Sequence, residues 1–287
     1  MKKIVSLLLA MTLLLPLLAS CAPSNPSGDT QPKASETNGV LRVSTSPDFA
    51  PMVFVDPDKR GQDQFVGFDI TLAKFIAQEL NMELEIMPMD FNACQLAVYA
   101  GTVDMSLAGY VWSASRAELY NLSDNYLAGN STDHQVLLTL EEQQGRFAEP
   151  SDFEGAIVGA QNTSLQQILV SEQLPLAELD LFTNLDIAVQ MLLAGDIDCL
   201  AVSVGNADAL LAAHPELGLT QFSFTLDQRY MGNVILLQKG NDELTAKVNA
   251  ILKKASVYFD EWYQQARATA GIQVIYDENG NVVGTIG

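Results

Sequence analysis

The chain is poor in the residue types that most often carry catalysis or hold metals. Its 287 residues include three cysteines, two histidines and only 15 lysines and arginines, against 35 aspartates and glutamates. His134 and His214 lack the paired spacing of a metal site, and Cys94 has no evident histidine partner that would activate its thiol. A net charge of −20 makes nucleic acid a poor partner. We therefore expect no enzyme activity, no catalytic residues, no metal, no cofactor and no nucleic-acid partner.

The longest apolar run lies at the N-terminus and is short for a membrane span. Residues 4–18 are largely apolar and follow Lys2 and Lys3. Because a spanning helix needs about 20 apolar residues, residues 1–20 are predicted to be a secretory signal peptide. The sequence Leu-Ala-Ser-Cys at residues 18–21 resembles a bacterial lipobox, which implies lipidation of Cys21. The alternative is an ordinary signal peptide that a cysteine happens to follow.

Residues 21–39 lack aromatic and large aliphatic side chains. Such a segment cannot bury enough apolar surface to offset its ordering entropy. We predict a flexible tether that leaves the folded part outside the cytoplasmic membrane and attached to it only through the lipid. In an oxidising compartment the remaining Cys94 and Cys199 could pair, but their apolar surroundings favour two separate, small buried side chains.

From residue 40 onward, strand patterns alternate with helical ones. Residues 41–45 alternate, whereas Phe68, Leu72 and Ile76 share one face of a helix that Asp69 is placed to cap. This alternation predicts βαβ units and a parallel-rich α/β fold. In the first half, a further strand is predicted at 103–108. The second half is predicted to contain strands at 156–160, 180–182 and 197–202 and helices at 164–174, 185–194 and 206–213.

Two five-residue segments, 100–104 and 194–198, repeat the same pattern. Each joins a helix end to a glycine and then to an apolar strand. They are separated by about the length of one α/β lobe. The repeat indicates two similar lobes, although so short a motif can recur by chance.

Nine short segments follow one another in a characteristic order. They are residues 41–45, 49–51, 65–70, 101–105, 116–118, 123–126, 158–161, 164–166 and 195–198. Together they resemble the family 3 solute-binding proteins, which are the polar amino-acid receptors of bacterial ABC importers. The resemblance extends over about residues 40 to 270, and the order of the segments carries it, since no single one is decisive.

The resemblance implies a type II periplasmic-binding-protein-like fold, with two lobes joined by two crossover strands. Residues 40–132 and 231–287 would form lobe 1, residues 133–230 would form lobe 2, and the ligand would be enclosed between them. The implied function is the capture of a small polar solute, an amino acid or a derivative, for ABC permease and ATPase subunits, by a monomer. Two alternatives remain: a cyclohexadienyl or arogenate-type dehydratase on the same fold, and a ligand receptor for a sensor kinase.

The resemblance also implies ligand-binding residues in lobe 1. Phe49 matches an aromatic that stacks on the ligand, and Arg116 matches an arginine that pairs with the ligand's carboxylate. Gly109 and Val111 lie beside Arg116 at a strand end, although Val111 replaces a hydroxyl side chain. From the residues alone, Phe49 could be a core residue and Arg116 a surface residue paired with nearby acids.

The implied lobe 2 residues include the main departures from the family. Ser164 matches a hydroxyl residue that closes onto the carboxylate, and as a minimum it caps a helix. Thr163 replaces a common glycine, and Ser203 replaces the aspartate that pairs with the ligand's α-ammonium. Two interpretations of Ser203 remain. Either Asp208, one helical turn further, takes over the ammonium, or the ligand lacks a free ammonium group.

Overall fold

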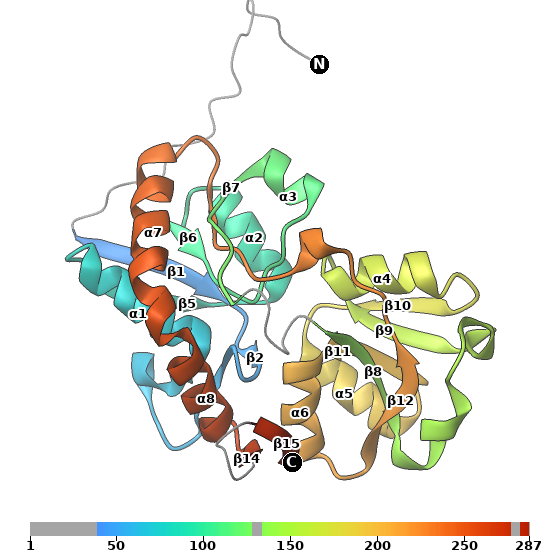
Figure 1. The fold of residues 1–287 in the computed structure, drawn as a ribbon. Helices are drawn as coiled ribbons and strands as arrows, with labels where there is room; N and C mark the ends of the chain where they lie inside the picture. Colours follow the sequence, from blue (N-terminus) through green and yellow to red (C-terminus); the bar gives the residue numbers. More distant parts are fainter. Residues whose placement is uncertain (1–38, 128–133, 277–281, 287) are drawn as a thin grey trace, which may run out of the picture. The chain divides into compact units, whose positions relative to one another are not determined.

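The computed structural model describes residues 39–127, 134–276 and 282–286, with side chains as far as Ile272 (Figure 1). The predicted signal peptide, Cys21 and nearly all of the predicted tether lie outside these residues. Within the described part, no helix combines the length and the apolar character needed to cross a membrane.

The first of two five-stranded sheets has the strand order β5-β1-β6-β13-β7. Its strands are β1 (Val40–Thr45), β5 (Glu83–Pro88), β6 (Met105–Ser106), β7 (Tyr120–Leu122) and β13 (Leu236–Gln238). Strand β1 is parallel to β5 and β6, whereas β13 is antiparallel to β6 and β7. Because β13 comes from late in the chain, two separate stretches build this sheet. We call the sheet and the helices packed on it lobe 1.

The second sheet has the order β10-β9-β11-β8-β12. Its strands are β8 (Gln135–Leu140), β9 (Ile157–Gln161), β10 (Glu178–Phe182), β11 (Cys199–Ser203) and β12 (Leu217–Ser223). Strand β9 is parallel to β10 and β11, and β8 is antiparallel to β11 and β12. This sheet and its helices form lobe 2. The two-lobed α/β fold predicted from the sequence is confirmed.

Of the two predicted limits between the lobes, only one lies within the described residues. The limit at 132/133 lies outside the described residues. The limit at 230/231 falls where the 3-10 helix Gln228–Tyr230 ends, ahead of β13. The detailed boundaries therefore stay a prediction.

Eight α-helices are described. Lobe 1 has α1 (Phe68–Glu79), α2 (Phe91–Tyr99), α3 (Ala114–Leu119), α7 (Asp242–Ala255) and α8 (Phe259–Thr269), and lobe 2 has α4 (Leu165–Gln173), α5 (Leu185–Ala194) and α6 (Val204–Ala213). A short sheet of β2 (Asp48–Phe49), β3 (Val53–Val55) and β4 (Phe65–Val66) adjoins α1, and β14 (Gln273–Tyr276) pairs with β15 (Val282–Ile286). The order of the elements places the start of both α4 and α6 directly after a lobe 2 strand.

The core of lobe 2 lies on both faces of its sheet. Adjacent residues Leu137 and Leu138 on β8 point to opposite faces, as strand geometry requires, and each joins a different buried apolar cluster. In lobe 1 the main cluster joins β1 to α1 and α7. Cys94 and Cys199 are both free and buried, one in each lobe, which confirms their interpretation as separate core side chains.

Two local predictions are wrong. Helix α1 has Gly67, not Asp69, at its N-cap, and Asp69 is fully buried in the first turn. The predicted strand 103–108 is reduced to β6, which ends shortly before the chain turns at Gly109, where φ is +62°. Both differences bear on the binding site.

Candidate ligand-binding site

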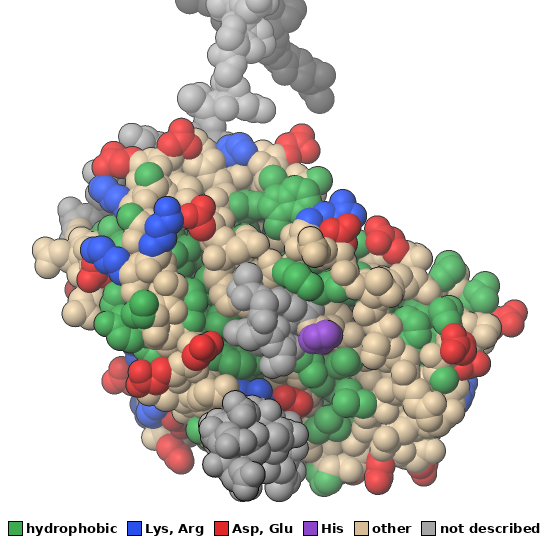
Figure 2. Space-filling model, in the orientation of Figure 1, with side chains coloured by type: hydrophobic (Ala, Val, Ile, Leu, Met, Phe, Trp, Pro, Cys, Tyr) green, Lys and Arg blue, Asp and Glu red, His purple; other side chains and the backbone are tan. Residues whose placement is uncertain are grey.

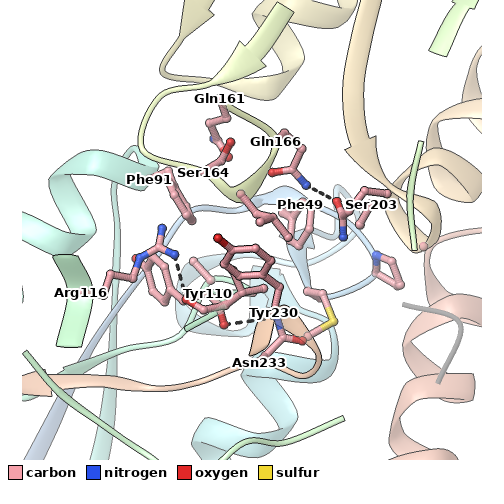
Figure 3. A pocket seen from close by; sticks show the side chains of 18 of the residues that line it. Phe49, Phe91, Tyr110, Arg116, Gln161, Ser164, Gln166, Ser203, Tyr230 and Asn233 are labelled. Atoms are coloured by element: carbon pink, nitrogen blue, oxygen red, sulfur yellow. Dashed lines mark hydrogen bonds between the residues drawn. The ribbon is translucent and has the colours of Figure 1, made fainter. Parts of the chain in front are cut away.

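A cleft between the lobes brings together all six residues implied as ligand-binding (Figure 3). Lobe 1 supplies Phe49, Gly109, Val111 and Arg116, and lobe 2 supplies Ser164 and Ser203. The other polar side chains that line the cleft are Tyr110, Gln135, Gln161, Gln166, Tyr230, Asn233 and Tyr263. The cleft therefore combines one arginine with hydroxyl and carboxamide groups.

Arg116 is held in a buried position with only 4% of its surface exposed. Ser113 caps α3 by accepting a hydrogen bond from the Arg116 amide. The guanidinium donates from Nη1 to the Val111 carbonyl at 2.9 Å and from Nη2 to the Thr163 carbonyl at 2.7 Å. Nε donates a longer hydrogen bond, of 3.4 Å, to Oε1 of Gln95. Burial lowers the pKa of Arg116 to about 10, so the side chain remains charged at neutral pH.

The alternative interpretation of Arg116 as a surface residue in an ion pair is wrong. No carboxylate of the described residues lies within ion-pair distance of it, and its guanidinium rests near the rings of Phe91 and Tyr110, at 5.8 and 5.3 Å. Its bonds use one N–H of each terminal nitrogen, which leaves a second N–H on each. A guanidinium can donate N–H groups of this kind to the oxygens of a carboxylate.

Thr163 shows why a glycine is common at its position. Its φ of +63° lies in the left-handed region, which costs a β-branched residue about 1–2 kcal/mol. In return, its hydroxyl accepts from the Gln95 side chain at 2.7 Å and donates to that of Asn92 at 3.1 Å. The loop before α4 is thereby joined to α2 of lobe 1.

Further direct bonds connect the lobes on the other side of the cleft. Asp48 of lobe 1 accepts from the Leu185 amide in the first turn of α5 at 2.7 Å. The Asn206 side chain on α6 donates to the Ala50 carbonyl at 3.0 Å. These contacts, with those of Thr163, hold the lobes together around the cleft.

Phe49 lies between the lobes, where it is both a residue of the cleft wall and part of the apolar packing. It lines the cleft and packs against the apolar clusters of lobe 1 and lobe 2. Gly109 makes room for it, because a Cβ at residue 109 would lie 2.5 Å from Phe49 Cε1. The aromatic wall of the cleft thus depends on a glycine.

Asp69 fixes the position of Gly109 beside this wall. Its carboxylate accepts hydrogen bonds from the Gly109 amide at 2.9 Å and from the Tyr126 hydroxyl at 2.8 Å. Burial raises its pKa from 3.8 to about 7, although both hydrogen bonds oppose the shift. The residue expected to cap α1 instead fixes the strand end that carries Gly109.

The pKa of Asp69 gives the stability of the protein a pH dependence. The folded state binds this proton more tightly than the unfolded state, so the contribution of Asp69 is most favourable below pH 4. It is lost as the pH rises towards 7, by at most about 1.4 kcal/mol per pH unit. We expect Asp69→Asn to flatten this part of the profile, measured as the unfolding free energy by urea titration from pH 4 to 8. Parallel profiles of the two proteins would contradict the assignment.

Ser164 and Ser203 begin helices α4 and α6 at the cleft. Their hydroxyls accept from the amides of Gln167 at 3.2 Å and Asn206 at 3.4 Å, which confirms the predicted N-cap Ser164 and identifies Ser203 as a second N-cap. Each hydroxyl keeps a proton that it can donate. The start of a helix favours negative charge through its free amides and its dipole. Lobe 2 therefore presents a surface suited to an anionic group.

Asp208, the candidate replacement for the missing aspartate, lies outside the described cleft wall. Its carboxylate forms an ion pair with Arg267 of α8 at 3.2 Å, and Asp208 does not line the cleft. No aspartate or glutamate occurs among the described residues of the cleft wall. The interpretation in which Asp208 binds the ammonium is therefore not supported by the geometry.

On the face shown in Figure 2, aspartate and glutamate side chains are scattered over both lobes, separated by neutral ones. This distribution agrees with an acidic surface that serves solubility.

The comparison with known proteins agrees with the fold and the cleft. Residues 41–265 match the model of the bacterial extracellular solute-binding proteins, family 3. The chain belongs to this family. Its described lobes resemble the amino-acid ABC transporter substrate-binding protein AbpA of Streptococcus pneumoniae, solved with L-arginine. That likeness has a TM-score of 0.74 and 25% identity, and covers 81% of this chain and 96% of AbpA.

Curated relatives of this family 3 protein include both receptors and enzymes. The arginine-binding extracellular protein ArtP of Bacillus subtilis is 31% identical over 167 residues, which are 58% of each chain. The membrane-bound lytic murein transglycosylase F of Idiomarina loihiensis is 27% identical over 79% of this chain, but the match spans only 48% of the enzyme. Membership of the family thus fixes the fold without fixing the ligand.

Proposed function

We propose that this family 3 protein is the receptor of an ABC importer and captures a small carboxylate, an amino acid or a derivative of one. The observation that carries the proposal is Arg116, a buried guanidinium in the cleft with two N–H groups left for a ligand. A buried charge without a partner is unfavourable. A bound carboxylate would supply that partner.

The two lobes would share the bound carboxylate. Arg116 approaches from lobe 1, while the Ser164 hydroxyl and the start of α4 approach from lobe 2. Phe49 would lie against the body of the ligand. Because these contacts come from both lobes, a ligand would favour the closed arrangement over any open one, which is capture by a population shift.

A thermal-shift screen of the purified protein with amino acids, acylated amino acids, other carboxylates and amines tests this proposal. A ligand at 100 times its Kd stabilises the folded state by about 2.7 kcal/mol. Carboxylates should raise the melting temperature and simple amines should not. A response to amines alone would contradict the proposal.

The dehydratase alternative finds no support in the cleft. Its described wall contains no aspartate, glutamate, histidine or cysteine that would act as acid or base. A role as receptor for a sensor kinase would use the same capture step. Co-purification of the cross-linked protein with a permease would favour transport.

We also propose that Cys21 is lipidated and that the tether links it to lobe 1. The lipobox-like sequence supports this. The wild type is expected in the membrane fraction, and globomycin should block its processing. The variant Cys21→Ala should leave the membrane fraction and show no acyl mass by mass spectrometry. Ser27→Ala, a change within the tether, is the matched control. Wild type without acyl mass would exclude the anchor.

A further inference from the structure

The cleft is unbalanced in charge. Among the described residues that line it, Arg116 is the one formally charged side chain. The carboxamides of Gln135, Gln161, Gln166 and Asn233 are neutral. A ligand carboxylate would balance Arg116, and any positive group on the same ligand would remain without a charged partner in this wall.

Three acids around the described cleft wall, Asp48, Asp69 and Asp208, are already engaged. Asp48 accepts from the Leu185 amide and from Ser46. Asp69 is bound by Tyr126 and Gly109 behind the wall, and Asp208 is paired with Arg267. None of the three lines the cleft. To pair with any of these three acids, an ammonium or guanidinium group on a ligand would have to displace an existing partner.

Tyr263, a residue of the cleft wall, carries a buried polar group that no described residue uses. This residue of α8 is 3% exposed, lines the cavity, and has a hydroxyl without a hydrogen-bond partner among the described residues. A buried hydroxyl without a partner is unfavourable. Burial raises the pKa of Tyr263 to about 12, so the group keeps its proton and can both donate and accept. An uncharged polar group on a ligand would satisfy it.

We propose that the ligand is a carboxylic acid whose other polar groups are uncharged, such as an N-acylated amino acid, and that the Tyr263 hydroxyl binds it. The inference rests on the proposed function, because it assumes that Arg116 binds the carboxylate. It assigns this protein a ligand of different charge from the L-arginine bound to AbpA. It also makes Tyr263 a specificity-determining residue.

Calorimetry with ligands of matched shape tests the charge. L-arginine ends in a charged group, whereas L-citrulline ends in an uncharged group of similar shape. The N-acetyl derivatives of citrulline, glutamine and alanine lack the α-ammonium. At pH 7.5, at least one acetylated acid should bind 100-fold more tightly than L-arginine. Ser203→Asp, which adds a carboxylate to the wall, should strengthen L-citrulline binding at least tenfold and weaken the acetylated acids. The inference is overturned if the wild type binds L-arginine as tightly as it binds every one of the acetylated acids.

A second set of variants tests Tyr263. Tyr263→Phe removes only the hydroxyl and should weaken the tightest acetylated acid at least fivefold, while Tyr258→Phe, at a 44% exposed tyrosine, should not. Equal affinity of Tyr263→Phe and wild type refutes the assignment of Tyr263. If L-arginine binds tightly and Arg116→Ala abolishes that binding, the proposed function stands and the inference about charge falls. If no acid binds, both fall.

Discussion

Replacing Arg116 by alanine is expected to weaken ligand binding by about 2–5 kcal/mol, roughly 30-fold to several thousand-fold. The variant loses the two N–H donors offered to the ligand carboxylate and leaves that carboxylate buried beside Phe91 and Tyr110 without a positive partner. Calorimetry with the tightest acid from the ligand screen measures the effect. Arg60→Ala is the matched control, because Arg60 is exposed and bonds only to nearby backbone carbonyls.

The same substitution also affects stability, so folding has to be followed. Arg116 donates to the carbonyls of Val111 and Thr163, and unpaired buried groups cost about 1–3 kcal/mol each. Arg116→Lys keeps the charge and loses the fork, and we expect it to bind more weakly than wild type and better than alanine. Full affinity in Arg116→Ala, with a native circular dichroism spectrum, would remove this residue from the site.

The variant Gly109→Ala is expected to lose at least tenfold in affinity and about 1–2 kcal/mol in unfolding free energy. The new Cβ would lie 2.5 Å from Phe49 Cε1, and the φ of +62° is unfavourable for alanine. The ring must shift, and it is the ring that forms the aromatic wall of the cleft. Calorimetry and urea titration measure the two effects.

Two controls separate the collision from the backbone effect. Gly155→Ala places alanine at a φ of +71° with nothing within 4 Å of its Cβ, so it has the backbone effect without the collision and affinity should be unchanged. Combining Gly109→Ala with Phe49→Leu removes the collision, and the double variant should lose less stability than the sum of the single losses. A strictly additive loss would show that the ring does not oppose the Cβ.

Sequence reasoning succeeded where the signals are local. Helix α5 has the predicted bounds because Asn184 caps its start and Gly195, with a φ of +78°, ends it. The predicted N-cap role of Ser164 likewise depends on a residue three positions away. The six site residues meet at one cleft because matched motifs place them at strand ends and helix starts, although their contact with a ligand stays a prediction.

The failures concern partners that are distant in the sequence. Asp69 has the spacing of a cap, but its partners Gly109 and Tyr126 lie 40 and 57 residues away. The pairing of Asp208 with Arg267 spans 59 residues. Tyr263 belongs to an amphipathic helix near the C-terminus, and nothing in its local pattern distinguishes a tyrosine of the cleft wall from one of the core.

Because hydrogen bonds join the lobes directly, the ease with which the lobes close and the preference for one ligand over another can change independently. Bonds such as those from Leu185 to Asp48 and from Asn206 to Ala50 involve no ligand atom, so they favour the closed form to the same extent whatever is bound. The apparent dissociation constant equals the intrinsic one divided by the closed fraction of the empty protein. Weakening such a bond should therefore scale the affinities of all ligands by one common factor and leave their ranking unchanged. Substitutions at such bonds can thus change how tightly the protein holds every ligand without altering which ligand it prefers.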